Sequence, residues 1–453
     1  MGRGYTLDEV QDIARNLVGK TFGEVDYYDT GSYDKGSFGH IIEESGFGYD
    51  INSKSEPDFV DAGIELKVTP YKVNKNGSLS AKERLVLNII NYMDEYKHDF
   101  YTSHFWYKNQ RLQILWYLYE EGKPKNKLKI THQLLFTFPE NDLKIIKKDW
   151  EQIIAKIKRG EAHLISEADT MYLGACTKGA NSKSLREQPF SNVKAMQRAF
   201  CLKTSYMTEL VREHIGSKKD IEIFLKSDDS FDDYVNSIVN KYKGKTITEL
   251  KNVLGVDSAA KNLNSLIINR MFSVKGNLGD TEEFLKANII PKTIRVQSNN
   301  HIKESMSFKA FNFIQLSKED WDNSYLKNKL LTTKYMFFVF KEEKKDYVFK
   351  GIKLWNMPYD VIETDVKKVW EKTKDILLSG NIVNYIDEKG RRITNFPGMS
   401  DNKVCHVRPH GRDSFDTFPL PVRDKVTGKD YYTKQCFWLN NSYVEQIIMG
   451  LIN

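Results

Sequence analysis

The sequence of 453 residues contains only four cysteines, and none of them forms a C-x-x-C pair. Their scatter argues against both a structural zinc site and a framework of disulfide bonds. The chain also has no signal peptide at its N-terminus and no apolar run long enough to cross a bilayer. These absences predict a soluble protein of a reducing cytoplasm, with no membrane partner.

A strong charge of either sign is also lacking. Lys and Arg total 68 and Asp and Glu total 61, which gives a formal net charge of +7. Domains that bind nucleic acid mainly through their overall charge are usually more basic, so composition alone does not establish a DNA partner. The length exceeds what one hydrophobic core usually serves, and it therefore predicts more than one domain.

The most informative stretch begins with Pro57-Asp58 and ends with Glu65-Leu66-Lys67. Apolar and polar residues alternate over residues 63–68, which predicts a short strand with Glu65 and Lys67 on one face. A loop can bring Asp58 beside that face. Mg²⁺ prefers hard oxygen ligands, and a lysine near the ion can position or deprotonate a water. The pattern predicts phosphodiester hydrolysis, with a turn and a solvated strand face as the alternative.

Periodic patterns on both sides of this stretch predict a sheet flanked by helices, and thus an α/β fold. A capping box, Thr6-Leu7-Asp8-Glu9, begins one helix, and residues 141–160 form an amphipathic helix. Apolar runs typical of strands occupy residues 84–91, 112–119 and 130–138.

Two more polar residues are candidates for the same site. Glu43 ends a short helical stretch and could reach the metal, although a glutamate after two isoleucines is more often a solvated helix residue. Lys108 directly precedes the run at 112–119, where it could serve the active site, contact a phosphate or simply be solvated.

Residues 175–186 are small, polar and basic, with no acidic residue among them. Asn, Lys and Arg are side chains that read base edges, while Ser, Lys and backbone amides hold phosphates. The segment therefore predicts DNA contact, with an exposed turn as the alternative. The candidate DNA-binding residues are Lys178, Asn181, Ser182, Lys183 and Arg186, together with Lys203 farther along the chain.

Four motifs occur in the order found in one known family. They are K-G-x-x-G-x3-E ending at Glu43, D-x6-E-L-K from Asp58, T-S-H-x3-K ending at Lys108, and K-G-A-N-S-K from Lys178. Residues 1–215 thereby resemble the MutH family of DNA endonucleases. The resemblance implies a PD-(D/E)xK fold (restriction-endonuclease-like) and Mg²⁺-dependent cleavage of double-stranded DNA at GATC. It also implies that Glu43 joins Asp58 and Glu65 as metal ligands, and that Lys108 supports the catalytic Lys67.

One departure concerns the F-Y-L-K motif of the mismatch-repair member, whose tyrosine senses adenine methylation. This chain has Cys201 in its place, which argues against a hemimethylation-directed repair nickase. The chain length and the motifs E-S-M-S-F at 304–308 and C-H-V-R-P-H at 405–410 resemble instead the two-lobed GATC restriction endonucleases of this family. That resemblance implies a type II enzyme that cuts both strands, in a prokaryotic restriction–modification context. A repair nickase and a non-catalytic DNA-binding protein are the alternatives.

The second half of the sequence repeats features of the first. Trp150-Glu151 precedes Gly160 as Trp370-Glu371 precedes Gly380, and F-C-L-K-T-S-Y at 200–206 parallels F-W-L-N-N-S-Y at 437–443. The expected organisation is a catalytic lobe at 1–215, a charged and helical connector at 216–272, and a second MutH-like lobe at 273–453. Chance similarity of short apolar segments is the alternative.

The repeat predicts a second lobe that is catalytically silent. Extending it backwards places Thr293 where the first lobe has Glu65, and Arg295 where it has Lys67. Such a lobe could bind a second GATC copy as an effector. Its candidate DNA contacts are Arg295, Lys303, Arg408, Arg412 and Lys434. The protein is expected to be a monomer in isolation, with a dimer or a loop possible on DNA.

Overall fold

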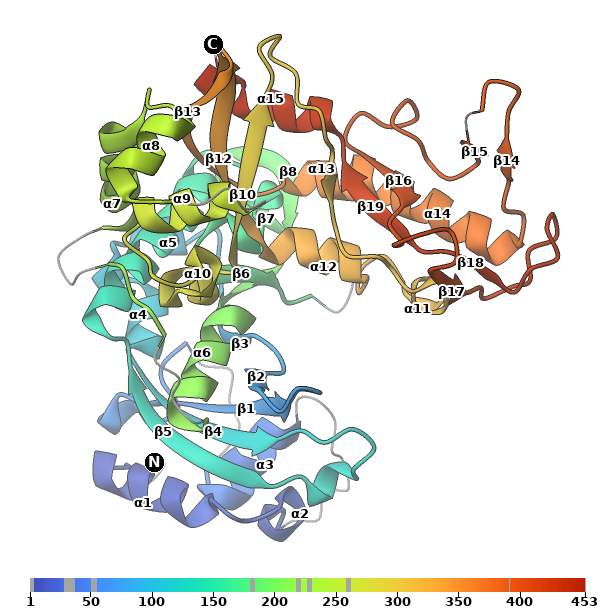
Figure 1. Cartoon of the computed structure of the whole chain (residues 1–453). Helices are drawn as coiled ribbons and strands as arrows, with labels where there is room; N and C mark the ends of the chain where they lie inside the picture. The colour runs from blue at the N-terminus through green and yellow to red at the C-terminus, as the bar shows by residue number, and fades with distance from the viewer. Residues whose placement is uncertain are drawn as a thin grey trace. The chain divides into compact units, whose positions relative to one another are not determined.

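The computed structural model describes residues 4–27, 37–49, 55–179, 184–216, 221–225, 230–257, 262–390 and 392–452. The chain forms two compact units, coloured mainly blue to green and mainly yellow to red in Figure 1. The first unit contains residues 1–231 and 279–288, and the second contains 232–278 and 289–453. The expected boundaries at 215 and 272 differ from this division, because residues 232–278 belong to the second unit. Across the described ranges, every helix is too short or too polar to cross a bilayer.

The first unit is a mixed α/β structure, as expected. Its helices are α1 (Leu7–Leu17), α2 (Phe22–Val25), α3 (Ser37–Ile41), α4 (His104–Asn109), α5 (Glu140–Lys158), α6 (Thr204–His214) and α10 (Glu282–Ala287). Its strands are β1 (Glu65–Val73), β2 (Leu79–Ala81), β3 (Leu85–Ile89), β4 (Arg111–Leu118), β5 (Ile130–Thr137), β6 (Leu173–Thr177), β7 (Leu185–Gln188), β8 (Ser191–Met196) and β9 (Arg198–Leu202).

Two sheets form the framework of this unit. The larger has the strand order β2-β1-β4-β5, in which β1 and β4 are parallel and the other pairs are antiparallel. The smaller has the order β3-β9-β6, and β7 and β8 form a separate hairpin. The predicted capping box at Thr6 is confirmed, and it starts α1, whose Val10 and Leu17 are buried beside α2, α3 and the larger sheet. The apolar alternation of β1 thus fixes which of its side chains face away from this core.

Helix α10 is joined to the first unit by a buried polar cluster. The Lys286 ammonium donates to both carboxylate oxygens of Asp142, at 2.9 and 3.0 Å, and lies 2.7 Å from Glu282. The Tyr206 hydroxyl donates to Asp142 at 2.7 Å, and the Ser205 hydroxyl donates to the Lys286 carbonyl at 2.7 Å. A buried ion pair that keeps its hydrogen bonds fixes the geometry of the groups around it. Helices α5, α6 and α10 are therefore held together.

The second unit is also α/β. Its helices are α7 (Phe231–Tyr242), α8 (Ile247–Leu254), α9 (Leu263–Met271), α11 (Phe313–Lys318), α12 (Tyr325–Thr332), α13 (Tyr359–Val361), α14 (Lys367–Ser379) and α15 (Asn441–Ile452). Its strands are β10 (Ile289–Val296), β11 (Met306–Ser307), β12 (Lys334–Glu343), β13 (Asp346–Trp355), β14 (Asn384–Ile386), β15 (Arg392–Thr394), β16 (Cys405–Pro409), β17 (Thr417–Pro419), β18 (Tyr431–Thr433) and β19 (Gln435–Leu439).

The strand pairings of the second unit follow those of the first. Strands β10 and β12 are parallel, like β1 and β4 of the first unit. Strands β12 and β13 are antiparallel, like β4 and β5. The sheet β11-β19-β16 has the same order and directions as β3-β9-β6. Each smaller sheet has a hairpin inserted before its last strand in sequence, β17-β18 or β7-β8.

A shared bulge aligns the two units residue by residue. The register shifts between Trp116 and Tyr117 in β4, and between Val339 and Phe340 in β12. Four residues before each shift, Leu112 pairs with Glu65 and Tyr335 pairs with Ile290.

Ile290 therefore occupies the position of Glu65, and Lys292 that of Lys67. The left-handed residues Gly63 (φ 62°) and Asn288 (φ 53°), each two positions before the aligned pair, agree with this alignment. The expected replacement of Glu65 by Thr293 and of Lys67 by Arg295 was wrong, because sequence similarity alone did not locate the bulge.

Candidate active site

The start of strand β1 brings a carboxylate and an ammonium together. Glu65 and Lys67 lie on one face of the strand, as predicted, and the Lys67 Nζ is 2.7 Å from the Glu65 Oε1. The loop before β1 returns Asp58 to the same place, because Phe59 forms a bridge with Ile64. The Asp58 backbone N–H donates to Glu65 Oε2 at 3.2 Å, and the Leu66 N–H donates to Asp58 Oδ2 at 2.9 Å. The loop and the strand thereby hold both carboxylates.

A second lysine reaches Glu65 from helix α4. Ser103 caps this helix by accepting a hydrogen bond from the Trp106 N–H, and Lys108 lies in the last turn. Its Nζ is 3.5 Å from Glu65 Oε2. The Glu65 side chain is 4% exposed, while each lysine side chain is 15% exposed. One buried carboxylate thus faces two ammonium groups that remain accessible from solvent.

Burial and the charge of Glu65 raise the pKa of two further carboxyl groups, those of Asp58 and Glu43. Burial, together with the charge of Glu65, raises the pKa of Asp58 to about 7. Glu43 lies in the π-helix Ile42–Gly46. Its pKa is also raised, mainly by burial and further by the charge of Glu65, while the charge of Lys67 opposes the shift. Buried carboxylates that repel one another gain most from a nearby cation. Asp58, Glu65 and Glu43 offer only hard oxygen donors, which fits Mg²⁺.

A pocket of about 500 Å³ opens beside Glu65 and Lys108. Lys178, predicted to contact DNA, lines the same pocket, together with Asn88 and Asn91. Ammonium and amide groups are suitable partners for phosphate oxygens and base edges. The pocket therefore places candidate DNA-binding groups next to the carboxylates.

The sequence reasoning missed a cluster formed by Asp94, His98 and His104. One ligand atom from each residue lies within 4.8 Å of the others, and His104 Nε2 is 2.8 Å from Asp94 Oδ2. Imidazole and carboxylate groups in such an arrangement can hold a transition metal. The Asp94–His104 contact also anchors the first residue of α4, the helix that carries Lys108. The spacing D-x3-H-x5-H is the sequence signal that could have drawn attention to it.

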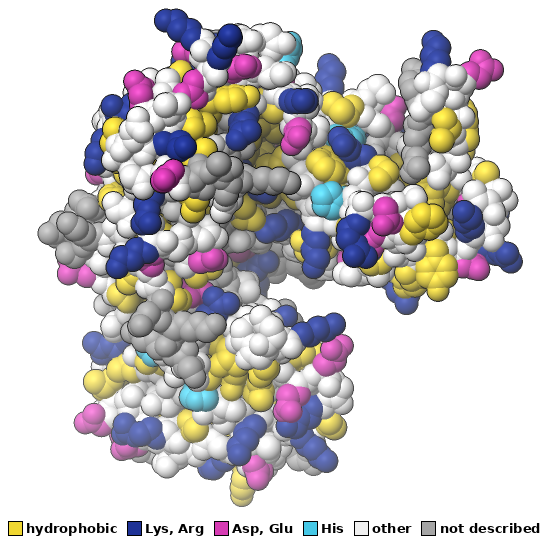
Figure 2. All heavy atoms as spheres, in the orientation of Figure 1, with side chains coloured by type: hydrophobic (Ala, Val, Ile, Leu, Met, Phe, Trp, Pro, Cys, Tyr) yellow, Lys and Arg dark blue, Asp and Glu magenta, His cyan; other side chains and the backbone are white. Residues whose placement is uncertain are grey.

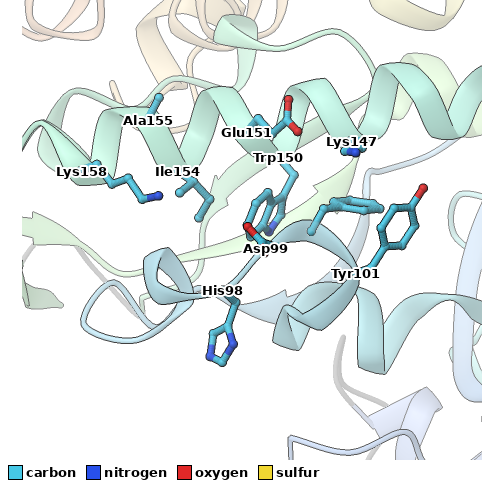
Figure 3. A pocket seen from close by; sticks show the side chains of 10 residues that line it. His98, Asp99, Tyr101, Lys147, Trp150, Glu151, Ile154, Ala155 and Lys158 are labelled. Atoms are coloured by element: carbon cyan, nitrogen blue, oxygen red, sulfur yellow. The ribbon is translucent and has the colours of Figure 1, made fainter.

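A second hollow, of about 330 Å³, lies between α5 and residues 98–101. Figure 3 shows Trp150 and Ile154 projecting from α5 toward this segment. Lys147 also lines the hollow, and its Nζ lies 5.2 Å from the centre of the Tyr101 ring. The predicted catalytic side chains do not contribute to its lining, so this hollow is separate from the pocket beside Glu65.

The predicted DNA contacts of the first unit have different outcomes. Asn181, Ser182 and Lys183 lie outside the described residues. Arg186 is exposed on the β7–β8 hairpin and donates to the Gln197 side chain at 3.0 Å. Lys203 is 1% exposed, however, and its ammonium donates to the Thr170 carbonyl.

The prediction for Lys203 was therefore wrong, because this lysine lies inside the protein. Asp149 stabilises its charge, while burial lowers its pKa. Asp149 also accepts hydrogen bonds from the backbone N–H groups of residues 171–173. Cys201 of the same segment is buried against Cys176. The F-C-L-K stretch is thus part of the core in this unit.

The basic residues predicted for the second unit are spread over several elements. Arg295 lies 5.4 Å from the Tyr347 ring, and Lys303 is exposed. Arg408 lies 4.5 Å from the Trp438 ring. Arg412 and Lys434 both face Asp416, at 3.7 and 2.5 Å. Figure 2 shows Lys and Arg side chains interspersed with acidic ones over the visible face of both units, which agrees with the modest net charge.

Comparison with known proteins agrees with this geometry. The family described as DNA mismatch repair enzyme MutH matches residues 47–149, a range that includes Asp58, Glu65, Lys67 and Lys108. The MutH protein of Shewanella woodyi is 28% identical over 224 residues, which cover 47% of this chain and 93% of that protein. MutH of Escherichia coli is 27% identical over 216 residues, covering 47% of this chain and 87% of that protein.

A much longer match covers both units. The type II restriction enzyme Sau3AI of Staphylococcus aureus is 37% identical over 485 aligned positions, which include 99% of each chain. The MutH proteins account for about half of the chain, whereas this enzyme accounts for all but a small part of it. The chain therefore belongs to the family of the type II restriction enzyme Sau3AI, and it shares a nuclease domain with the mismatch repair protein MutH.

Proposed function

We propose that the first unit hydrolyses both strands of double-stranded DNA at GATC in a reaction that requires Mg²⁺. The observation that carries this proposal is the meeting of Asp58, Glu65 and Lys67 at the start of β1, next to a pocket lined by Lys108 and Lys178. The GATC sequence follows from the likeness to Sau3AI. We further propose that the enzyme acts in the cytoplasm of a prokaryote, as the cutting part of a restriction–modification system.

Each side chain has a distinct role in this proposal. The ion would be held by Asp58, Glu65 and Glu43, in the arrangement of a PD-(D/E)xK site. One side of the bound ion would face the DNA. A bound Mg²⁺ would stabilise negative charge on the phosphate and lower the pKa of a water. Lys67, fixed by Glu65, would orient that water or take its proton. Lys108 would offset charge that develops on the phosphate oxygens.

A plasmid assay tests this function. A supercoiled plasmid with one GATC site should be converted to linear DNA with Mg²⁺, while a matched plasmid without the site should stay intact. Ca²⁺, with its longer bonds and looser coordination, should support binding without efficient cleavage. A nicked circle as the only product would favour a MutH-like nickase, and the absence of any metal-dependent cleavage would favour a non-catalytic DNA-binding protein.

We also infer that the second unit is a duplicated, catalytically silent copy that binds another GATC duplex and activates the first unit. The common strand pairings and the common bulge support a duplication. Ile290 at the position of Glu65 removes a metal ligand. In this arrangement the first unit (residues 1–231 and 279–288) carries the catalysis, and the second unit (residues 232–278 and 289–453) binds the effector DNA. A monomer would thus bind two duplexes or loop one DNA molecule.

Activation requires that the effector duplex bind the active state more tightly than the inactive state. A plasmid with two sites should therefore be cut faster than one with a single site. A short GATC duplex added in trans should accelerate cleavage of the single-site plasmid. Equal rates on both plasmids, with no effect of added duplex, would leave the second unit as a structural or dimerisation element.

A further inference from the structure

Two lysines of the second unit occupy the positions of the two lysines of the active site. Lys292 lies two residues after Ile290 on β10, as Lys67 lies two residues after Glu65 on β1. Lys329 lies five residues after Ser324, the N-cap of α12, and Lys108 lies five residues after Ser103, the N-cap of α4. Both caps are serines whose hydroxyl accepts a hydrogen bond from the third helical N–H. The second unit has thus kept both ammonium groups and lost the carboxylate between them.

Among the residues that the structure describes, Lys292 and Lys329 form no ion pair with a carboxylate, and neither faces an opposite charge that raises its pKa. Burial lowers the pKa of Lys292. Burial also lowers the pKa of Lys329, and the positive charge of Lys292 lowers it further. Lys67 and Lys108 both contact Glu65, so the equivalent positions bring the two ammonium groups toward one place, and both side chains are partly shielded from water.

A third lysine, also on α12, has its charge neutralised by carboxylates. This lysine is Lys327, and its ammonium lies 2.7 Å from Asp322 and 2.5 Å from Glu363. These contacts raise its pKa despite burial. Lys327, a buried lysine of this helix, thus has carboxylate partners. Two neighbouring lysines without such partners destabilise the fold unless an anion binds between them.

We propose that Lys292 and Lys329 hold a backbone phosphate of DNA in the second unit, at the place where the first unit holds the phosphate that it cuts. This inference rests on the proposed binding of a second duplex by that unit. Ile290 replaces the metal-binding carboxylate, so the phosphate is bound and not hydrolysed. The lysines thereby take over the charge neutralisation that a cation would provide at a catalytic site.

A binding titration of the full chain tests the inference. A short fluorescent duplex with one GATC site is titrated in Ca²⁺, and the wild-type chain is expected to bind two copies. In Lys292→Met/Lys329→Met the second copy should bind at least about tenfold more weakly. The slope of its affinity with salt should fall by about one unit, as expected when one phosphate contact is lost. Lys292→Arg/Lys329→Arg should restore most of this binding, and the matched control Lys353→Met, at an exposed position of β13, should change neither quantity.

Thermal unfolding separates this role from a structural one. Removal of two unpaired, mutually repelling charges should leave the melting temperature of the double methionine variant equal to that of the wild type, or higher. A fall of several degrees would contradict the reading of these lysines as ligands for an external anion. Inorganic phosphate should compete with the second duplex only at high concentration. Tight binding of phosphate alone, with duplex affinity unchanged in the variant, would indicate a free-anion site and overturn the inference.

The outcomes also separate this inference from the function on which it rests. A wild-type chain that binds one duplex and is not stimulated by another would refute the effector role itself. Two duplexes bound equally well by the wild type and by the double methionine variant would leave the effector role standing and refute only the phosphate contact at Lys292 and Lys329.

Discussion

Replacement of Glu65 by glutamine should abolish most cleavage while leaving DNA binding intact. The change keeps the shape of the side chain but removes the charge that faces Lys67 at 2.7 Å and Lys108 at 3.5 Å. At an effective dielectric constant of about 20, these gross attractions are about 6 and about 5 kcal/mol. Lys67 and Lys108 lose the carboxylate that holds them in position, and the metal ion loses an anionic ligand. A positioned catalytic group typically contributes about 10²–10⁴ in rate, or about 3–5 kcal/mol of barrier.

Single-turnover cleavage of a GATC duplex with excess enzyme and Mg²⁺ measures this loss directly, because product release does not enter the rate. Duplex affinity in Ca²⁺ should stay within about threefold of the wild-type value, because the lysine and amide groups that line the pocket and contact DNA are unchanged. Glu120→Gln is the matched control, because Glu120 follows β4, is exposed and pairs with solvent-accessible Lys123. A Glu65→Gln variant that kept more than about a tenth of the wild-type cleavage rate would refute the assigned role.

Three further predictions concern the pH response, the fold and DNA binding. The folded-state pKa of Asp58 is about 7 and its ordinary value is 3.8, so the metal-free fold should lose stability as pH rises between these values. Mg²⁺ must displace the proton of Asp58 to bind. Calorimetry should therefore show the affinity for Mg²⁺ falling as pH is lowered below about 7. Lys286→Met should lower the free energy of unfolding in urea by about 3–5 kcal/mol, because it leaves the buried Asp142 carboxylate without its ammonium partner; no change would contradict a stabilising role for this ion pair. Arg186→Ala should weaken binding to GATC by about 1–3 kcal/mol if Arg186 reads a base, or weaken binding to all duplexes equally if Arg186 holds a phosphate. Fluorescence anisotropy on matched duplexes with and without GATC distinguishes these two results from no effect.

The sequence was most informative where local rules determine the structure. The capping box at Thr6 and the alternation after Gly63 depend on neighbouring residues, and both led to correct elements. The convergence of Glu65 and Lys67 follows from the same two-residue period. Lys108 reaches Glu65 only because β4 pairs in parallel with β1, a tertiary fact that no local pattern contains.

Features that depend on tertiary contacts were missed. Lys203 has the charge of a DNA contact, but every residue of the preceding strand β9 is buried, and the lysine follows that strand into the interior. The counterparts Ile290 and Lys292 depend on the position of a single bulge. A one-residue insertion in a strand changes the alignment of everything beyond it, and neither its presence nor its place was visible in the composition of β12 and β13.

The return of residues 279–288 to the first unit means that no single cut in the chain separates a complete nuclease from the rest. A fragment ending at residue 215 would lack α10 and would bury the Asp142 carboxylate without its ammonium partner. A soluble first unit made in isolation would need this ten-residue segment attached through an artificial linker. During synthesis, the nuclease unit cannot be completed until residue 288 has emerged, when residues 232–278 of its neighbour are already available to fold. The appearance of cleavage activity is thereby delayed until more than half of the polypeptide has been made.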